Sequence, residues 1–193
     1  MNEFALLPLL FARARDTFRD PRAVARWLMG LRIPTAERWL ILALIAVVSG
    51  ALAHVSMAIV AGPFAVPAPI AMALAQGVTL WVMVVAIHGL GRWAGGHGTL
   101  DDTIVLVAWV QVILLGLQVV QIVLALVAPM LAMLLGLAGI VVLFWLLTVF
   151  TAELHGFAAP GAVFFSLFLG SLVLATLERF VFGLFGLSML GAI

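Results

Sequence analysis

The chain has 193 residues, of which 66% are hydrophobic and 9% are charged, and its formal net charge is +1. A soluble domain of this size cannot keep so much apolar side chain out of water, whereas a lipid bilayer accommodates it. Cysteine is absent, so these residues offer no disulfide, no thiol nucleophile and no cysteine ligand for a metal. We therefore predict a single membrane domain.

Basic residues are concentrated at the start of the chain. All nine are arginines, and seven of them come early: Arg13, Arg15, Arg19, Arg22, Arg26, Arg32 and Arg38. A short apolar run at residues 4–11 precedes these charges, whereas a signal peptide places its charges first, so we expect no cleavable signal peptide. Residues 1–37 are predicted to form an amphipathic cytoplasmic or interfacial segment.

Asp20 and Pro21 are typical of a helix start, an N-cap followed by proline at the first helical position. The helix that follows is amphipathic, with Arg22 and Arg26 opposite an apolar stripe. That stripe consists of Val24, Trp27, Leu28 and Leu31. Two placements are open: the segment lies in the headgroup layer, with Arg22, Arg26 and Trp27 contacting lipid, or it packs on the cytoplasmic end of the protein's own helices.

The longest apolar stretch, Thr103 to Ala152, holds fifty residues without an acidic, basic or histidine side chain. Because a bilayer span needs about 20 apolar residues, the stretch is long enough for two spans. Pro129 divides it near the middle, and proline interrupts helices. Only helices and closed barrels satisfy the backbone in lipid, and continuous apolarity does not fit the alternation of barrel strands. The stretch predicts a transmembrane helical hairpin.

Five transmembrane helices are predicted in all, so the fold class is an all-α integral membrane bundle. The spans are expected at about 38–61, 70–90, 103–127, 129–152 and 161–178, and with an apolar tail they form the domain 38–193. The end of the fifth span is open. In the first alternative the span stops at Glu178 and Arg179, and in the second it continues past them as one long tilted helix. We prefer the first, because charge inside a bilayer is costly.

An odd number of spans places the two ends of the chain on opposite sides of the membrane. Arginine accumulates on the cytoplasmic side, so the early arginines predict a cytoplasmic N-terminus and a periplasmic C-terminus. Arg92 falls on the cytoplasmic side in the same arrangement, and the loops 62–68 and 128–129, which carry no arginine, fall outside. We predict a multi-pass protein of the bacterial inner membrane.

This topology brings one group of polar residues to the cytoplasmic face. The group consists of His88, Arg92, His97, Asp101, Asp102, Glu153 and His155. It is a candidate binding site for a metal, a lipid headgroup or a partner protein. The alternative is that polar residues collect at the interface by default. The zinc-protease spacing HExxH is absent, and Asp101 or Asp102 is expected to cap the third span.

A second polar group lies within the membrane. Gln111, Gln118 and Gln121 fall within an arc of about 80° on the third span, and Gln76 of the second span could meet them. They form hydrogen bonds between helices or line a path for a small solute. Near the outer side, His54 and Glu178 could pair, either as a structural contact or as a proton site.

Four features follow one another along the chain: DPRA at 20–23, GGHGTLDD at 95–102, a glutamine-containing third span at 106–124, and AELHGF at 152–157. With them the chain resembles the bacterial branch of the Yip family (Ypt-interacting proteins, the "Yip-one" domain). The resemblance implies five spans and a cytoplasmic N-terminus. Eukaryotic relatives are tied to Rab GTPases, vesicle traffic and membrane shaping, but their signature regions contain tyrosines. This chain has none, so Rab binding is not carried over.

The sequence shows no catalytic constellation. We expect a non-enzymatic accessory, scaffold or membrane-organising protein, with no cofactor and no metal. Its expected partners are membrane lipids, another membrane protein or a second copy of itself, and not nucleic acid, because its basic residues are confined to the approach to the membrane. The alternative is a small transporter or channel for a solute or ion that uses the polar residues of the third span.

Overall fold

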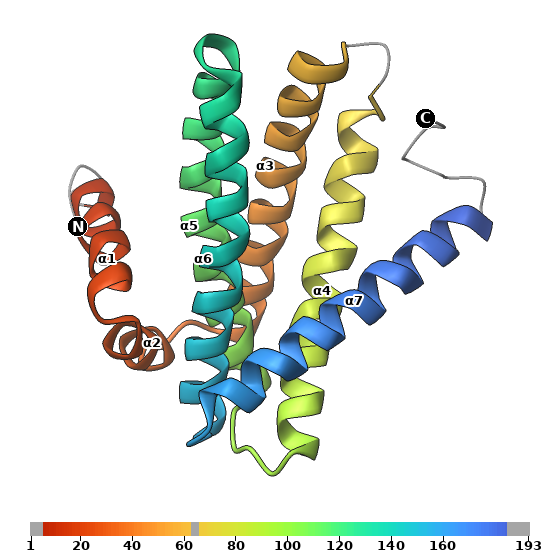
Figure 1. The fold of residues 1–193 in the computed structure, drawn as a ribbon. Coiled ribbons are helices and arrows are strands. Elements are labelled where there is room, and N and C mark those ends of the chain that lie inside the picture. Colours follow the sequence, from red (N-terminus) through yellow and green to blue (C-terminus); the bar gives the residue numbers. More distant parts are fainter. Residues whose placement is uncertain (1–5, 63–65, 185–193) are drawn as a thin grey trace.

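The computed structural model describes residues 6–62 and 66–184, and helices are the only regular secondary structure within them. Figure 1 shows their arrangement, with α3 to α6 side by side and α7 crossing at an angle. The helices are α1 (Leu6–Arg19), α2 (Pro21–Met29), α3 (Thr35–Ala61), α4 (Pro69–Trp93), α5 (Leu100–Val127), α6 (Pro129–His155) and α7 (Pro160–Leu184). The predicted all-α fold class is thereby confirmed.

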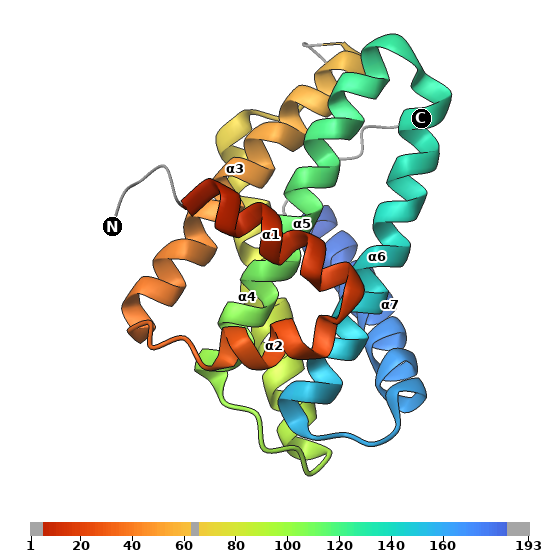
Figure 2. The same cartoon turned by 90° about the vertical axis from the view of Figure 1, so that its left-hand side faces the viewer.

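Helices α1 and α2 meet at a sharp corner at Asp20. Asp20 Oδ1 accepts a hydrogen bond from Ala23 N at 2.9 Å, and Pro21 lies in the first turn, so the predicted start of α2 is confirmed. Figure 2 shows α2 lying across the bundle, where it contacts α5 and α6. Its buried residues are Val24, Ala25 and Leu28. The apolar stripe of α2 therefore packs on the protein's own helices.

Four helices are long and apolar enough to cross a bilayer: α3, α4, α5 and α6. Their ends lie within about three residues of the predicted ones, because caps, prolines and loop glycines mark them in the sequence. In α7 the recognised apolar stretch is Pro160–Val173, which is shorter than a full span. Four of the five predicted spans therefore have a matching helix, and the fifth stays a prediction.

The preferred end of the fifth span was wrong as a helix boundary, because α7 runs without a break through positions 178 and 179 to Leu184. The prediction used the cost of charge in a bilayer, but that cost governs how deep a helix lies, not whether its backbone hydrogen bonds continue. Proline, which would interrupt those bonds, is absent from 161–184. The side chains of Glu178 and Arg179, and the tail from 185 onward, lie outside the described residues.

The core of the fold is the first half of α5. All nine residues from Thr103 to Gln111 are buried, because α2, α3, α4 and α6 all contact this helix. The outer faces of the spans carry exposed apolar side chains, such as Val123 of α5 and Val141 of α6. In a bilayer these faces contact lipid chains.

Candidate functional site

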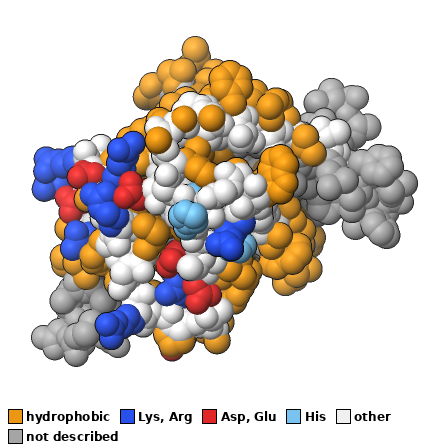
Figure 3. Space-filling model, turned by 90° about the horizontal axis from the view of Figure 1, so that it is seen from below, with side chains coloured by type: hydrophobic (Ala, Val, Ile, Leu, Met, Phe, Trp, Pro, Cys, Tyr) orange, Lys and Arg blue, Asp and Glu red, His pale blue; other side chains and the backbone are white. Residues whose placement is uncertain are grey.

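One end of the bundle holds most of the charged and polar side chains. We call it the polar end; there α2, the α4–α5 loop and the α6–α7 loop come together. Figure 3 shows this end, with arginine, acidic and histidine side chains among apolar ones. Three contacts join elements at this end: Arg26 with Glu153 joins α2 to α6, Arg38 with Asp102 joins α3 to α5, and Gly98 with His155 joins the α4–α5 loop to α6.

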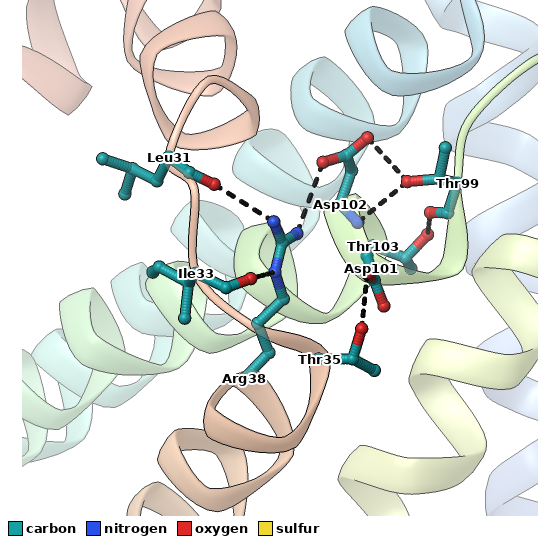
Figure 4. Close-up of polar contacts among 8 residues, drawn as sticks. All are labelled: Leu31, Ile33, Thr35, Arg38, Thr99, Asp101, Asp102 and Thr103. Carbon is teal, nitrogen blue, oxygen red and sulfur yellow. Dashed lines mark hydrogen bonds and ion pairs between the residues drawn. The ribbon is translucent and has the colours of Figure 1, made fainter.

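Arg38 is the most buried charged side chain of the polar end, at 8% exposure. Its Nε donates to the Ile33 carbonyl at 2.7 Å and its Nη2 to the Leu31 carbonyl at 3.1 Å, while Nη1 lies 3.4 Å from Asp102 Oδ1. Figure 4 shows the guanidinium between these partners. The planar fork of Arg38 thus ties the α2–α3 linker to the start of α5.

Asp101 and Asp102 lie in the first turn of α5 but do not cap it. Thr99 is the N-cap: its Oγ1 accepts from Asp102 N at 3.1 Å and donates to Asp102 Oδ2 at 2.6 Å (Figure 4). Asp101 Oδ2 accepts from the Thr35 hydroxyl at 2.7 Å. The prediction that Asp101 or Asp102 is the cap was wrong, because α5 starts at Leu100 and both aspartates lie inside its first turn.

Glu153, in the last turn of α6, is joined to α2. Its Oε1 accepts from Arg26 Nη1 at 2.7 Å. The Arg26 side chain is 58% exposed, so solvent screens the pair and its contribution to stability is about 1 kcal/mol or less. The pair therefore orients α2 more than it stabilises the fold.

His155 ends α6 and is 2% exposed. Its Nδ1 accepts from Gly98 N at 3.3 Å, which leaves Nε2 to donate to the Ile87 carbonyl at 3.2 Å. A Cβ added at Gly91 or Gly96 would lie 2.1 Å from His155 Nε2 or 2.5 Å from His155 Nδ1. Gly91 at the end of α4 and Gly96 of the α4–α5 loop thus allow the backbone to approach a neutral imidazole that uses both nitrogens.

The other predicted members of the polar cluster lie apart from this histidine's hydrogen bonds. Arg92 and His97 are exposed, and we call them the rim. His88 is half-buried, and its Nδ1 is buried without a hydrogen-bond partner. Among the described residues, no three or more acidic or histidine side chains could hold a metal ion together. The predicted cluster is therefore divided into residues that make interhelix contacts, the exposed rim, and the half-buried His88.

A second set of contacts at the polar end was missed from the sequence. Thr17 Oγ1 of α1 accepts a hydrogen bond from Trp109 Nε1 of α5 at 2.9 Å, and both side chains are buried. Trp27 stacks edge-on against Trp109 at 6.4 Å, and the Arg13 guanidinium lies 4.5 Å above the Trp27 ring. The feature of the sequence that could have indicated these contacts is the pair of tryptophans, Trp27 and Trp109, because tryptophan is enriched at the membrane interface where the basic segment is expected.

The predicted lipid contacts differ in their surroundings. Arg22 is exposed, and it makes no ion pair or hydrogen bond with the described residues. Arg26 is paired with Glu153, and Trp27 is half-buried against Trp109. Of the three, Arg22 is the one whose charged group is left for a ligand.

The glutamines lie at different depths in the bundle. Gln111 is buried at 9% exposure, while Gln118, Gln121 and Gln76 are half-buried. The amide of Gln121 lies against Gly136 of α6, where an added Cβ would be 2.8 Å from its Nε2. This packing fits the interpretation that glutamines hold helices together, and it gives no support to a solute path.

A cavity of about 10 Å³ lies between α4, α5 and α6 near the polar end. Most of its lining is apolar, including Ile87, Leu106 and Phe150. That volume is near the minimum for one water molecule and far below the few hundred Å³ of a small-molecule pocket.

His54 lies at the far end of the bundle, which holds the α3–α4 and α5–α6 turns. Its Nδ1 is 2.9 Å from the Pro67 carbonyl, so it bridges α3 and the segment before α4. The side chain of Glu178 lies outside the described residues, and the predicted pair of these two groups stays a prediction.

A bundle of long apolar helices, in which the charged side chains that the structure describes gather at one end, defines an integral membrane protein. Comparison with family models is more specific: the model of the Yip1 domain matches residues 15–178. The chain belongs to the Yip1 domain family, as its motifs had suggested. No curated protein and no solved structure matches the chain.

Proposed function

We propose that the protein is a non-enzymatic accessory or scaffold protein of the bacterial inner membrane that organises lipid and partner membrane proteins around its helices. One observation carries the proposal: the charged side chains of the polar end hold helices together. Arg38, Asp102 and Glu153 each bind another element of the fold. Side chains with such structural partners are poorly suited to bind and release a substrate.

The outer faces of the spans support the same function. Exposed apolar side chains cover α5 and α6 up to their turn at Ala128, including Val120, Leu126, Met130 and Leu137. Such faces accept lipid chains or the helices of another membrane protein, since both are equally apolar. The rim at the polar end supplies exposed charge that a partner could recognise.

The experiment is native mass spectrometry of the tagged, full-length protein, extracted gently from its own membrane. We expect a discrete partner protein at fixed stoichiometry. A rim variant, Arg92→Ala with His97→Ala, should lose partner mass but keep its melting temperature, because neither exposed side chain makes a hydrogen bond or ion pair with the described residues. A protein that carries only lipids, in wild type and variant alike, would contradict the accessory role.

A further inference from the structure

Three neighbouring arginines at the junction of α1 and α2 have no partner among the residues that the structure describes. We call Arg15, Arg19 and Arg22 the arginine corner. All three are exposed, and none makes an ion pair or hydrogen bond with the described residues. The nearby Arg13 and Arg26 are engaged instead with Trp27 and with Glu153. Figure 3 shows arginine side chains gathered over the edge of the molecule formed by α1 and α2.

The acidic neighbours of the corner do not neutralise it. Asp16 lies 3.8 Å from Arg13, and Asp20 uses its carboxylate to cap α2. Residues 13–32 contain six arginines against these two aspartates. The corner therefore keeps a net positive charge while its three guanidinium groups remain available.

The contacts of α1 fix the depth of the corner relative to the spans. Thr17 binds Trp109, which lies about 27 Å from the far end of α5 at 1.5 Å per residue. Phe18 stacks on Trp145, which lies about 24 Å from the far end of α6. The hydrocarbon core of a bilayer is about 30 Å thick. The corner is thus held near the boundary between hydrocarbon and headgroups.

Apolar side chains extend from the corner toward the membrane interior. The start of α1 lies beside the middle of the bundle, farther from the polar end than α2 is (Figures 1 and 2). Leu10 and Phe11 are 43% and 74% exposed there, and Phe18 is 47% exposed. At 100° per residue, Phe11, Arg15 and Phe18 share one side of α1. A single surface therefore presents acyl-chain contacts next to guanidinium groups.

We propose that the arginine corner binds the phosphate of an anionic phospholipid whose acyl chains lie along the exposed start of α1. Guanidinium groups donate paired hydrogen bonds to phosphate oxygens, and all three corner residues are arginine. Phe11 and Phe18 are exposed beside the guanidinium groups, and a phospholipid offers acyl chains to cover them next to the phosphate that the arginines bind. The proposal rests on the proposed function in so far as that includes lipid binding, and it names the lipid class.

The test uses the full-length protein in nanodiscs of equal parts phosphatidylglycerol and phosphatidylcholine, released for native mass spectrometry. We expect the wild type to retain phosphatidylglycerol in preference. The variant Arg15→Gln, Arg19→Gln, Arg22→Gln should reduce that preference at least tenfold, since each arginine near a membrane surface contributes about fivefold before screening by salt. The control, Arg32→Gln, removes an exposed arginine outside the corner and should keep the preference.

Three results would overturn the proposal: no preference in the wild type, an unchanged preference in the corner variant, or an equal loss in the control. Loss of a bound protein from the corner variant with an unchanged lipid preference would assign the corner to a protein instead. A wild type that binds a partner protein at fixed stoichiometry but shows no preference between lipids would refute this inference alone. The accessory function would stand in that case.

Discussion

The imidazole of His155 fits its site because glycines surround it. Gly91 of α4 and Gly96 and Gly98 of the α4–α5 loop all approach the end of α6 closely. Both ring nitrogens bind backbone groups of α4 and its loop. A histidine in a polar cluster usually suggests a metal or a proton-transfer role, but here it fastens a loop.

Substitution of Gly96 tests this packing. Gly96→Ala places a Cβ 2.5 Å from His155 Cβ, which is close to the backbone and cannot move aside cheaply. Overpacking of this kind costs about 1–3 kcal/mol, so we expect a melting temperature in detergent about 5 °C lower. The control Gly89→Ala, where a Cβ meets nothing within 4 Å, should not lower it. Equal melting temperatures for the two variants would show that close packing of Gly96 against His155 does not matter for stability.

Substitution of Arg38 tests a second side chain of the polar end. Arg38→Gln removes the charge and the fork that reaches two carbonyls and Asp102. We expect a loss of about 2 kcal/mol in stability, since hydrogen bonds to charged groups contribute about 1.5–3 kcal/mol. Thermal unfolding followed by tryptophan fluorescence would measure it, with the exposed Arg32→Gln as the control. A variant as stable as the wild type would show that the contacts of Arg38 do not stabilise the fold.

At the scale of elements, the sequence predicted helices well and their partners poorly. The ends of α3 to α6 were found because prolines, glycines and caps act locally. The contacts of the α1–α2 pair were not, because they join distant residues: Arg26 and Glu153 are 127 positions apart, and Thr17 and Trp109 are 92 apart. In the sequence, these polar residues are equally consistent with a binding site and with contacts between helices. Only the positions of their side chains in the structure distinguish the two.

The hydrogen bond between Thr17 and Trp109 should hold α1 in place. Thr17→Val keeps the shape of the side chain but removes the acceptor, leaving a buried indole N–H unpaired at a cost of about 1–3 kcal/mol. Because α1 and α2 are rich in arginine, limited digestion with trypsin reports whether they are docked. We expect faster cleavage at these arginines in Thr17→Val.

Ser166→Ala serves as the control for that digestion, since the Ser166 hydroxyl bonds within its own helix to the Ala162 carbonyl and is exposed. Identical cleavage rates for Thr17→Val and the wild type would mean that this bond does not hold α1.

At the scale of the whole molecule, the arginine distribution predicts which end faces the cytoplasm. A chain without cysteine allows single cysteines to be introduced as reporters. In intact cells, a membrane-impermeant maleimide should label Ala128→Cys at the far end, and should label His97→Cys only after permeabilisation. The reverse pattern would contradict the expected orientation, although the fold would be unaffected.

Polar side chains of the polar end hold α1 and α2 against the spans. The most direct measurement is the distance between spin labels at Arg22→Cys in α2 and Ala158→Cys in the α6–α7 loop, in reconstituted protein. We expect one narrow distance distribution, which broadens when Thr17→Val and Glu153→Gln remove two of these contacts. A broad distribution in the otherwise unaltered protein, unchanged by those substitutions, would contradict this arrangement.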